Sequence, residues 1–341
     1  MAAVIVYVVS GSGGSPTVVT PVDTATHAAG PPIVLAKGGQ SIAATPNGKT
    51  VYVPIISLKA VIPIRTADNA ALAPIPVGSQ PFALVMTPNG RTLYVCNSGS
   101  ASVTPIRVRT MSALPDIPVG ATPTRVAITP NGRTVYVVND TDNTVTPIRV
   151  STNTARPAIP VGGFPNSVAI TPDGKTLYVG AFGDGTVTPI EIRTNTAGPP
   201  IPVGNGPAAI VVTPNGRMAY VSNQNDDTVT PIRTATNTAL PAIAVGHLPF
   251  DMAITPNGRT LYVLNSGGAS VTPIRVATNS AGPPIPVPVN PFTLALAPNG
   301  KTLYVTGGAN LLLPIRTSND HPGSPIVVGA SPSAMAFATV A

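Results

Sequence analysis

The chain has 341 residues, of which only 9% are charged, and its formal net charge is +7. The single cysteine, Cys96, excludes an intrachain disulfide, and we expect it to be a buried, inert thiol. No run of 18 apolar residues occurs, which excludes a transmembrane helix.

The predicted elements repeat along the chain. After a β-rich segment at Met1–Ser10, a T-P-[ND]-G motif recurs every 42 residues, and its seventh copy reads A-P-N-G. The copies begin at Thr45, Thr87, Thr129, Thr171, Thr213, Thr255 and Ala297. A period of about 40–45 residues is typical of propellers and other repeat arrays. Eight tyrosines hold one position in the repeat, so we count eight units.

Each unit predicts four short strands. In the unit that contains Tyr136, the four predicted strands are the segments 125–129, 134–139, 144–150 and 157–162, which are rich in β-branched residues. The Asn-Gly dipeptide between the first two favours a tight hairpin turn. Four strands in 42 residues correspond to one propeller blade.

Prolines interrupt the third and fourth strands of most units. Proline is tolerated on edge strands and at bulges, so the fourth strand is predicted to be the outer edge of the blade. For the proline of the third strand, as in Pro105, Pro147 and Pro231, we predict a bulge.

The two ends of the chain complement each other. Met1–Ser10 corresponds to a second strand with no first strand before it, and the last residues correspond to a first strand with nothing after it. Pairing these segments in one blade would close a ring. The sequence therefore predicts an all-β protein in which residues 1–341 form a single-domain, eight-bladed β-propeller with four-stranded blades.

The sequence "TPNGRTLYVCN", followed by "VTPIR" and "IPVG", resembles the YVTN family of β-propeller repeats over nearly the whole chain. The family includes surface-layer and secreted proteins, and its wider superfamily includes lactonase-like and lyase-like enzymes. The resemblance implies a secreted or cell-surface location, although we find no signal peptide and a cytoplasmic location stays open. This chain has Ile-Arg where family blades often have Ile-Asp, and it has eight units where many members have seven blades.

Basic residues recur at two positions of the repeat, the end of the third strand and the turn after the first. Both positions are expected on one face of the ring. This face is interpreted either as a solubilising rim or as a docking surface for an anionic polymer or membrane headgroup. Nucleic acid is not predicted as a partner, because no aromatic residues interleave for base stacking.

The segments that join one blade to the next differ from unit to unit, and most phenylalanines fall in them. Because these loops gather at one mouth of the channel, we expect an apolar ligand site there. Phe182 comes from a loop between second and third strands on the same face. The predicted ligand-binding residues are Gln80, Phe82, Thr124, Phe164, Asn166, Phe182, Phe250, Asn290, Phe292 and Thr293. The alternative is that the phenylalanines fill the channel as core.

His247 and Asp251 lie four residues apart at this mouth and could form a general acid–base pair. Arg125 could hold a carboxylate or an oxyanion there, or neutralise Asp251. Two functions stay open: a binding or scaffold protein for a small molecule, a glycan or a partner loop, and an enzyme of lactonase, lyase or cyclase type that uses His247, Asp251 and Arg125.

No cofactor or metal site is predicted. Asp142, Asp184 and Asp226 occupy one repeat position in the loops between second and third strands. Oxygen-rich loops can bind calcium. An aspartate at a tight turn more often accepts hydrogen bonds from nearby backbone, which is the interpretation favoured here.

Overall fold

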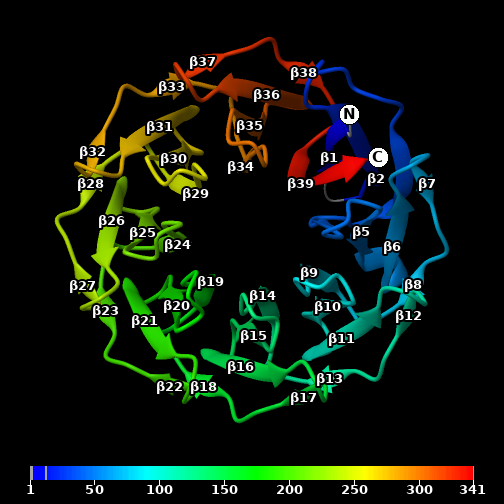
Figure 1. Cartoon of the computed structure of the whole chain (residues 1–341), viewed down its shortest axis with the longest axis horizontal. Helices are drawn as coiled ribbons and strands as arrows, with labels where there is room; N and C mark the ends of the chain where they lie inside the picture. The colour runs from blue at the N-terminus through cyan, green and yellow to red at the C-terminus, as the bar shows by residue number, and fades with distance from the viewer. Residues whose placement is uncertain (1–2, 12–13, 341) are drawn as a thin grey trace.

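The computed structural model of the protein describes residues 3–11 and 14–340. Its strands form eight antiparallel sheets, arranged as blades around a central axis (Figure 1). The predicted all-β, single-domain propeller with eight blades is confirmed. A short 3-10 helix, η1 (Ile56–Leu58), is the single helical segment in the part of the chain that the structure describes.

Every blade has the same order from the axis outward. The innermost strands are β4 (Ala43–Ala44), β9 (Pro81–Met86), β14 (Pro123–Ile128), β19 (Pro165–Ile170), β24 (Pro207–Val212), β29 (Pro249–Ile254), β34 (Leu294–Leu296) and β39 (Pro332–Val340). The second strands are β1 (Ala3–Ser10), β5 (Thr50–Ile55), β10 (Thr92–Asn97), β15 (Thr134–Asn139), β20 (Thr176–Ala181), β25 (Met218–Asn223), β30 (Thr260–Asn265) and β35 (Thr302–Gly307).

The third strands are β2 (Pro16–Asp23), β6 (Ala60–Arg65), β11 (Ser102–Arg107), β16 (Thr144–Arg149), β21 (Thr186–Glu191), β26 (Thr228–Arg233), β31 (Ser270–Arg275) and β36 (Leu311–Arg316). The outer edge is β3 (Ile33–Lys37) in one blade and a pair of two-residue strands in each other blade. These pairs are β7 (Ala70–Ala71) and β8 (Ile75–Pro76), β12 (Ser112–Ala113) and β13 (Ile117–Pro118), β17 (Thr154–Ala155) and β18 (Ile159–Pro160), β22 (Thr196–Ala197) and β23 (Ile201–Pro202), β27 (Thr238–Ala239) and β28 (Ile243–Ala244), β32 (Ser280–Ala281) and β33 (Ile285–Pro286), and β37 (His321–Pro322) and β38 (Ile326–Val327).

The split outer edge explains the proline of the third strand, and the predicted bulge at that position is wrong. Pro105 pairs in regular register with Tyr94. Its carbonyl accepts the Leu114 N–H at 2.8 Å, in the gap between β12 and β13. The nitrogen of a strand residue faces the same side as its carbonyl, so the missing N–H of Pro105 faces this gap and interrupts no ladder bond.

The hydrophobic core lies between adjacent blades. In one cluster Tyr94 and Cys96 of β10 pack with Val135, Val137 and Ile148 of the next blade. All eight tyrosines are at most 1% exposed. Cys96 is fully buried, as predicted, and burial raises the pKa of its thiol to about 12.

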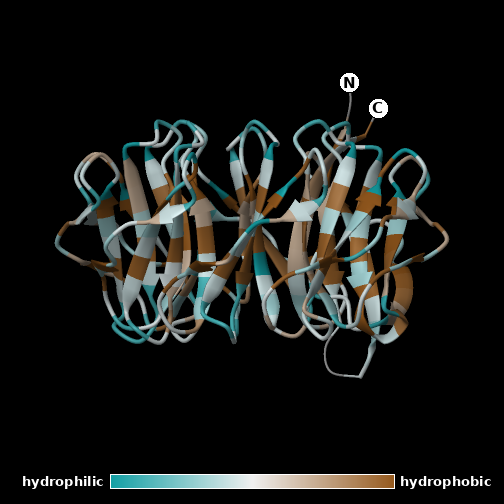
Figure 2. Ribbon diagram, turned by 90° about the horizontal axis from the view of Figure 1, so that it is seen from below, coloured by the Kyte–Doolittle hydropathy of each residue, from teal (hydrophilic) through white to brown (hydrophobic). Residues whose placement is uncertain are grey.

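The ring closes through its two ends. β39 pairs antiparallel with β1 over the length of both strands, so residues from opposite ends of the chain complete one blade (Figure 1). The predicted closure is confirmed. Seen from the side, polar loops cover both faces of the ring and the hydrophobic residues lie on the strands between them (Figure 2).

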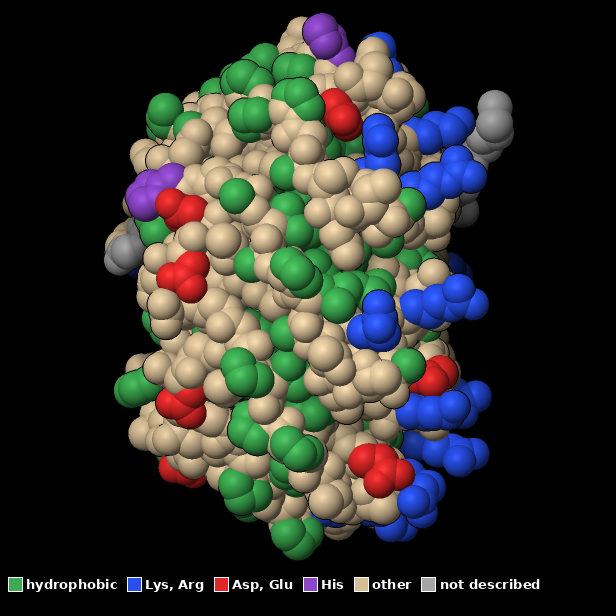
Figure 3. All heavy atoms as spheres, turned by 90° about the vertical axis from the view of Figure 1, so that its left-hand side faces the viewer, with side chains coloured by type: hydrophobic (Ala, Val, Ile, Leu, Met, Phe, Trp, Pro, Cys, Tyr) green, Lys and Arg blue, Asp and Glu red, His purple; other side chains and the backbone are tan. Residues whose placement is uncertain are grey.

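The two faces carry opposite charge. We call the face formed by the turns after the first and third strands the basic face, and the opposite one the mouth face. Lysine and arginine gather along one face in Figure 3, and acidic residues recur along the other. By their places in the strand order, sixteen of the nineteen basic residues belong to the basic face: Lys49, Arg65, Arg91, Arg107, Arg109, Arg133, Arg149, Arg156, Lys175, Arg193, Arg217, Arg233, Arg259, Arg275, Lys301 and Arg316.

Candidate functional site

A cavity of about 1060 Å³ occupies the central channel. Its wall comes from the innermost strands and the loops that lead into them. Nine of the thirteen residues predicted for the site line it: Phe82, Thr124, Arg125, Asn166, Phe250, Asp251, Asn290, Phe292 and Thr293. The inter-blade segments, which differ most between units, thus supply most of the channel wall.

A β-bulge directs two consecutive side chains toward the channel in six of the eight innermost strands. In β14, Pro123 pairs with Asn139 and Arg125 pairs with Val138, so Thr124 is the extra residue. Side chains of a regular strand alternate between its two sides, but a bulge breaks this alternation. Thr124 and Arg125 both line the cavity for this reason. Equivalent register shifts occur in five other blades.

Three phenylalanines line the cavity without filling it. The rings of Phe250 and Phe292 lie 5.7 Å apart, and Phe292 is 51% exposed. Phe82 is half-buried and its ring centre lies 5.9 Å from the guanidinium carbon of Arg125. The alternative in which these rings plug the channel as core does not fit their exposure. They leave an apolar wall that a ligand can contact.

Arg125 is the basic residue of the cavity wall. It is half-buried and donates from Nη1 to the Thr124 carbonyl at 3.0 Å. Burial lowers the pKa of Arg125, while Asp251 and Asp140 act in the opposite direction. None of the ion pairs found in residues 3–11 and 14–340 involves Arg125. A guanidinium has five N–H donors, so several of its donors are available to an anionic group.

Asp251 is held from the neighbouring blade. Its Oδ2 accepts hydrogen bonds from Thr293 Oγ1 at 2.7 Å and from the Leu294 N–H at 3.0 Å. Its Oδ1 accepts the Met252 N–H at 2.8 Å. Burial raises the pKa of Asp251, although these hydrogen bonds and the charge of Arg125 oppose the shift. Asp251 and Arg125 come from blades three apart in the ring, on different sides of the channel.

The predicted pair of His247 and Asp251 is not formed. His247 is exposed on the loop before β29, and its Nδ1 lies 3.1 Å from both carboxylate oxygens of Asp227. Asp227 Oδ1 also accepts the Leu248 N–H at 2.9 Å, which orients it toward this loop. The bulge points Asp251 to the channel, whereas the preceding loop carries His247 to the rim, so four residues of separation do not bring them together.

Three further predicted residues lie outside the cavity. Gln80, Phe164 and Phe182 belong to loops of the mouth face and do not line the channel. Phe164 is 65% exposed, and its carbonyl accepts the Phe182 N–H at 3.0 Å.

Sequence reasoning missed polar residues of the cavity wall, among them Gln40, Ser41, Ser167 and Ser333. The signal was the proline that opens most innermost strands, because the two positions after it form the channel wall. Ser333 follows Pro332, and Ser167 is the second residue after Pro165.

The aspartates of the mouth face link loops. Oδ2 of Asp142 accepts the Ala121 N–H, and Oδ2 of Asp184 accepts the Gly163 N–H, both at 2.7 Å. The carboxylates therefore bind the backbone of the loop that enters the blade rather than that of their own turn. Within the described ranges there is no group of three or more His, Cys, Asp or Glu side chains placed to hold a metal.

Similar folds occur in several solved structures. Hydrazine synthase of Kuenenia stuttgartiensis is 24% identical over 82% of this chain and 96% of that chain, with a TM-score of 0.66. The dihydro-heme d1 dehydrogenase NirN, in complex with DHE, is 15% identical over 97% and 74%, with a TM-score of 0.82. Apo AztD from Citrobacter koseri is 13% identical over 100% and 99%, with a TM-score of 0.75. These identities show a shared fold alone.

No curated protein matches the sequence. None of the helical structure in residues 3–11 and 14–340 is long and apolar enough to cross a membrane. A family model described as "Lactonase, 7-bladed beta-propeller" matches residues 58–161 and 184–283, which together are more than half of the chain. The protein therefore belongs to this lactonase family of β-propellers, in which it has eight blades instead of the seven of the family description.

Proposed function

We propose that the protein binds a small, partly apolar molecule that carries an anionic group, and that the site is the central channel. The observation that carries the proposal is the guanidinium of Arg125, which has no ion-pair partner among the described residues and lies beside the aromatic ring of Phe82 in the wall of a cavity of about 1060 Å³. Cavities of roughly 300–1,000 Å³ with an apolar lining and a few polar groups are usual for small-molecule sites.

The electrostatics favour an anion at Arg125. A half-buried guanidinium without a carboxylate partner has lost part of its hydration, and a ligand carboxylate could accept two parallel hydrogen bonds from it. The apolar part of such a ligand would lie against Phe82, Phe250 or Phe292. Asp251, across the channel, would disfavour a second anionic group and favour a hydroxyl or amine at that end.

Nearby polar atoms support a ligand with hydrogen-bonding groups. Thr124 Oγ1, Asn166 Oδ1 and Ser167 Oγ are buried and have no hydrogen-bond partner among the described residues. These residues all line the cavity. A buried polar atom left without a partner costs about 1–3 kcal/mol, so a rotation of the Thr124 or Ser167 side chain that turns its hydroxyl toward the cavity would let a ligand supply the missing bond. In this proposal the YVTN-like repeat is the scaffold, and the specificity lies in the residues that differ between blades.

The family match supports a second candidate, hydrolysis of a lactone in the same cavity. Asp251 would take a proton from a water molecule while the water oxygen bonds to the carbonyl carbon of the lactone. Arg125 would stabilise the oxyanion that forms on the carbonyl oxygen. The ring C–O bond would then break, and the proton would pass to the leaving alkoxide to give a hydroxy acid. His247 has no part in this version, because its partner is Asp227 at the rim.

Calorimetric titration tests the binding proposal with a panel of aryl and alkyl carboxylates, their amides and the corresponding lactones. We expect a carboxylate to bind the wild type and to lose at least tenfold in affinity in Arg125→Gln, which removes the charge-assisted bonds. Arg107→Gln is the matched control, because it removes one exposed arginine of the basic face.

The outcomes separate the candidates. Equal binding of carboxylates and amides, or an undiminished affinity in Arg125→Gln, would contradict the binding proposal. Turnover of a lactone that Asp251→Asn abolishes would establish the enzyme. Tight carboxylate binding without any lactone turnover would leave a binding protein.

A further inference from the structure

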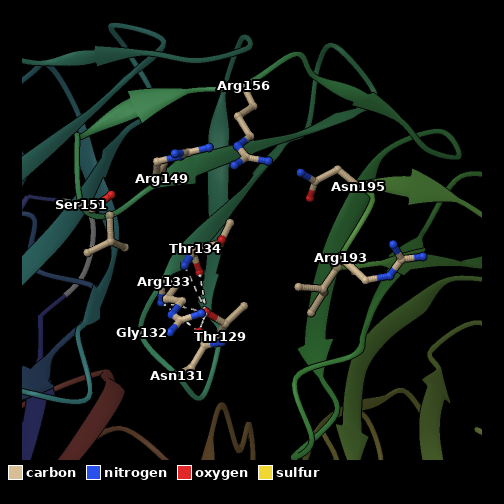
Figure 4. Close-up of a pocket in the computed structure, with 12 residues that line it drawn as sticks. Thr129, Asn131, Gly132, Arg133, Thr134, Arg149, Ser151, Arg156, Arg193 and Asn195 are labelled. Atoms are coloured by element: carbon tan, nitrogen blue, oxygen red, sulfur yellow. Dashed lines mark hydrogen bonds between the residues drawn. The ribbon is translucent and has the colours of Figure 1, made fainter.

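A groove on the basic face lies between the blade of β14–β18 and the blade of β19–β23. Most of its lining comes from the turns after the first and third strands, whereas the channel cavity is lined mainly by the innermost strands and the loops that lead into them. The volume of the groove is about 550 Å³. Arg133, Arg149 and Arg156 line it from one blade, and Arg193 and Asn195 line it from the next (Figure 4). Four arginines thus border one small groove that the proposed channel site does not use.

The repeat shows that two of these arginines are additions to the scaffold. In every blade the carbonyl of the third-strand proline accepts an N–H from the residue that corresponds to Arg156. Those residues are Gly30, Leu72, Leu114, Gly198, Leu240, Gly282 and Gly323. Arg156 is therefore the one charged residue at this position of the repeat.

Arg193 is also unusual at its position. The N–H of the residue before it bonds the Lys175 carbonyl, and this bond recurs in the other blades. In the seven other blades the residue that follows the donor of this bond is Ala25, Ala67, Arg109, Ser151, Ala235, Ala277 or Ser318. By its place in the repeat, Arg109 stands to Lys49 and Arg65 as Arg193 stands to Arg133 and Arg149. There, however, Arg65 Nη2 lies 2.7 Å from Asp68 Oδ2, and Leu72 holds the position of Arg156.

The positive charge of the groove is poorly neutralised. Arg193 Nη2 lies 3.2 Å from Glu191 Oε1, and both side chains are exposed. No carboxylate in the described part of the chain lies within ion-pair distance of Arg133, Arg149 or Arg156. Like charges that share a groove repel one another, and a bound anion would turn this repulsion into attraction.

The scaffold holds the walls in place. Asn195 Oδ1 accepts the Tyr136 hydroxyl at 2.6 Å, which ties the second blade to the first beneath the groove. On the other side, Thr129 Oγ1 accepts the backbone N–H groups of Arg133 and Thr134 (Figure 4). Because these bonds already order the loops that line the groove, a ligand would not have to order them on binding, and less conformational entropy would be lost.

We propose that this groove binds a soluble anion with two or more linked phosphate groups. Arginine forks match phosphate oxygens, and several arginines around one concave site suit several adjacent anionic groups better than a single carboxylate. The concave shape favours a free oligophosphate over the flat surface of a membrane. Asn195 and Ser151 offer further polar contacts to the phosphate oxygens.

Calorimetric titration with inorganic diphosphate and tripolyphosphate tests the proposal at physiological ionic strength, with succinate for comparison. The groove variant is Arg156→Leu/Arg193→Ser, which introduces the residues that neighbouring blades have at these positions. The matched control is Arg259→Ala/Arg275→Ala, which removes two charges from another part of the same face. Thermal unfolding of each variant verifies that it is folded.

We expect one diphosphate site per chain, at least a tenfold loss of affinity in the groove variant and less than a twofold loss in the control. Equal losses in the two variants would mean a diffuse basic surface and would overturn the proposal, as would the absence of diphosphate binding. Tighter binding of succinate than of diphosphate would overturn it as well.

Two further experiments sharpen the result. Leu240→Arg/Ala277→Arg recreates the four-arginine arrangement around Arg217 and Arg233, and we expect a second diphosphate site in this variant. Co-sedimentation with vesicles that contain phosphatidic acid separates the two sources of phosphate. Binding to these vesicles without any binding of free diphosphate would contradict a soluble ligand.

Discussion

The Tyr136 hydroxyl donates a hydrogen bond to Asn195 Oδ1 at 2.6 Å, across the boundary between two blades. The same bond joins Tyr94 to Asn153, Tyr178 to Asn237 and Tyr220 to Asn279. The acceptor residues have positive φ, a conformation that asparagine tolerates better than most residues. This repeated bond gives these four tyrosines of the core a partner in the next blade.

Within the described residues, the tyrosine of the blade that contains β5 has no such bond. Tyr52 OH is buried without a partner among the described residues, and Met111 occupies the position of the asparagine with a φ of 49°. We expect Met111→Asn to stabilise the protein by about 1 kcal/mol, because it supplies an acceptor and suits the positive φ. Differential scanning calorimetry should show a rise in Tm of roughly 1–3 °C.

The reverse substitution is the control. Asn153→Met should destabilise by about 1–3 kcal/mol, because it leaves the Tyr94 hydroxyl buried without its acceptor. Tyr52→Phe should be nearly neutral, whereas Tyr94→Phe should not. If Met111→Asn lowered the Tm, the interblade bond would not be the reason that asparagine recurs at this position.

The tyrosines also predict how the protein unfolds in alkali. Burial raises the pKa of seven of them to about 12: Tyr7, Tyr52, Tyr94, Tyr136, Tyr178, Tyr220 and Tyr304. Burial and the Asp320 carboxylate raise the pKa of Tyr262 as well. The unfolded value is about 10, so the neutral phenol is favoured in the folded state.

This stability is fully present below about pH 10 and is lost as the pH rises through about 12. We expect one steep alkaline transition in which phenolate absorbance and loss of β-structure by circular dichroism coincide. Phenolate formation near pH 10 while the circular dichroism stays native would contradict the burial of these side chains.

The sequence predicted the architecture well, because each blade repeats one local pattern. Turn dipeptides, tyrosine spacing and the two incomplete end segments specified the blade count and the closure without any long-range information. Predicting individual contacts was harder. His247 and Asp251 are four residues apart, but a bulge between Pro249 and Asp251 separates a rim loop from a channel strand, and the sequence marks that bulge only by the proline at the start of the strand.

The residues of the channel wall could be predicted only in part. The phenylalanines were visible as departures from the repeat, yet Phe164 lies in the exposed loop whereas Phe250 lies one residue beyond the strand proline. A shift of two positions, from the residue before the proline to the residue after it, decides between rim and channel. The split outer strand was likewise hidden, because proline is compatible both with a bulge and with a gap in the ladder.

Asp251 allows a direct test of the channel electrostatics. Burial raises its pKa and the charge of Arg125 lowers it, so Arg125→Gln should raise the Asp251 pKa further. A folded-state pKa above the unfolded value means that stability is greatest below the unfolded pKa and is lost as the pH rises through the folded pKa. The variant should therefore lose more stability than the wild type as the pH rises above the unfolded value of about 4.

Carbon-detected NMR titration of labelled aspartate carboxyls measures this shift. Arg149→Gln removes a basic-face arginine and should leave the Asp251 titration unchanged. An unchanged Asp251 pKa in Arg125→Gln would mean that the two residues do not interact through the channel, and it would weaken the proposed anion site.

The closing blade should open more easily than the others, because one of its strands is joined to the ring only at one end. Phe337 of β39 lies opposite Val6 of β1, and its ring centre is 5.9 Å from that of Tyr304 in the neighbouring blade. Phe337→Ala removes half-buried apolar contacts, and we expect a cost of about 2 kcal/mol. Ile128 holds the equivalent position in β14, so Ile128→Ala is the matched control.

Native-state hydrogen exchange distinguishes local opening from global unfolding. In Phe337→Ala the amides of β1 and β39 should exchange about 10- to 100-fold faster, while those of distant blades change little. Ile128→Ala lies in a blade whose strands are joined in sequence, so its effect should spread over the whole ring. A uniform increase of exchange in Phe337→Ala would mean that the pairing of the two ends is as strong as the covalent connections elsewhere, and that the ring unfolds as one cooperative unit.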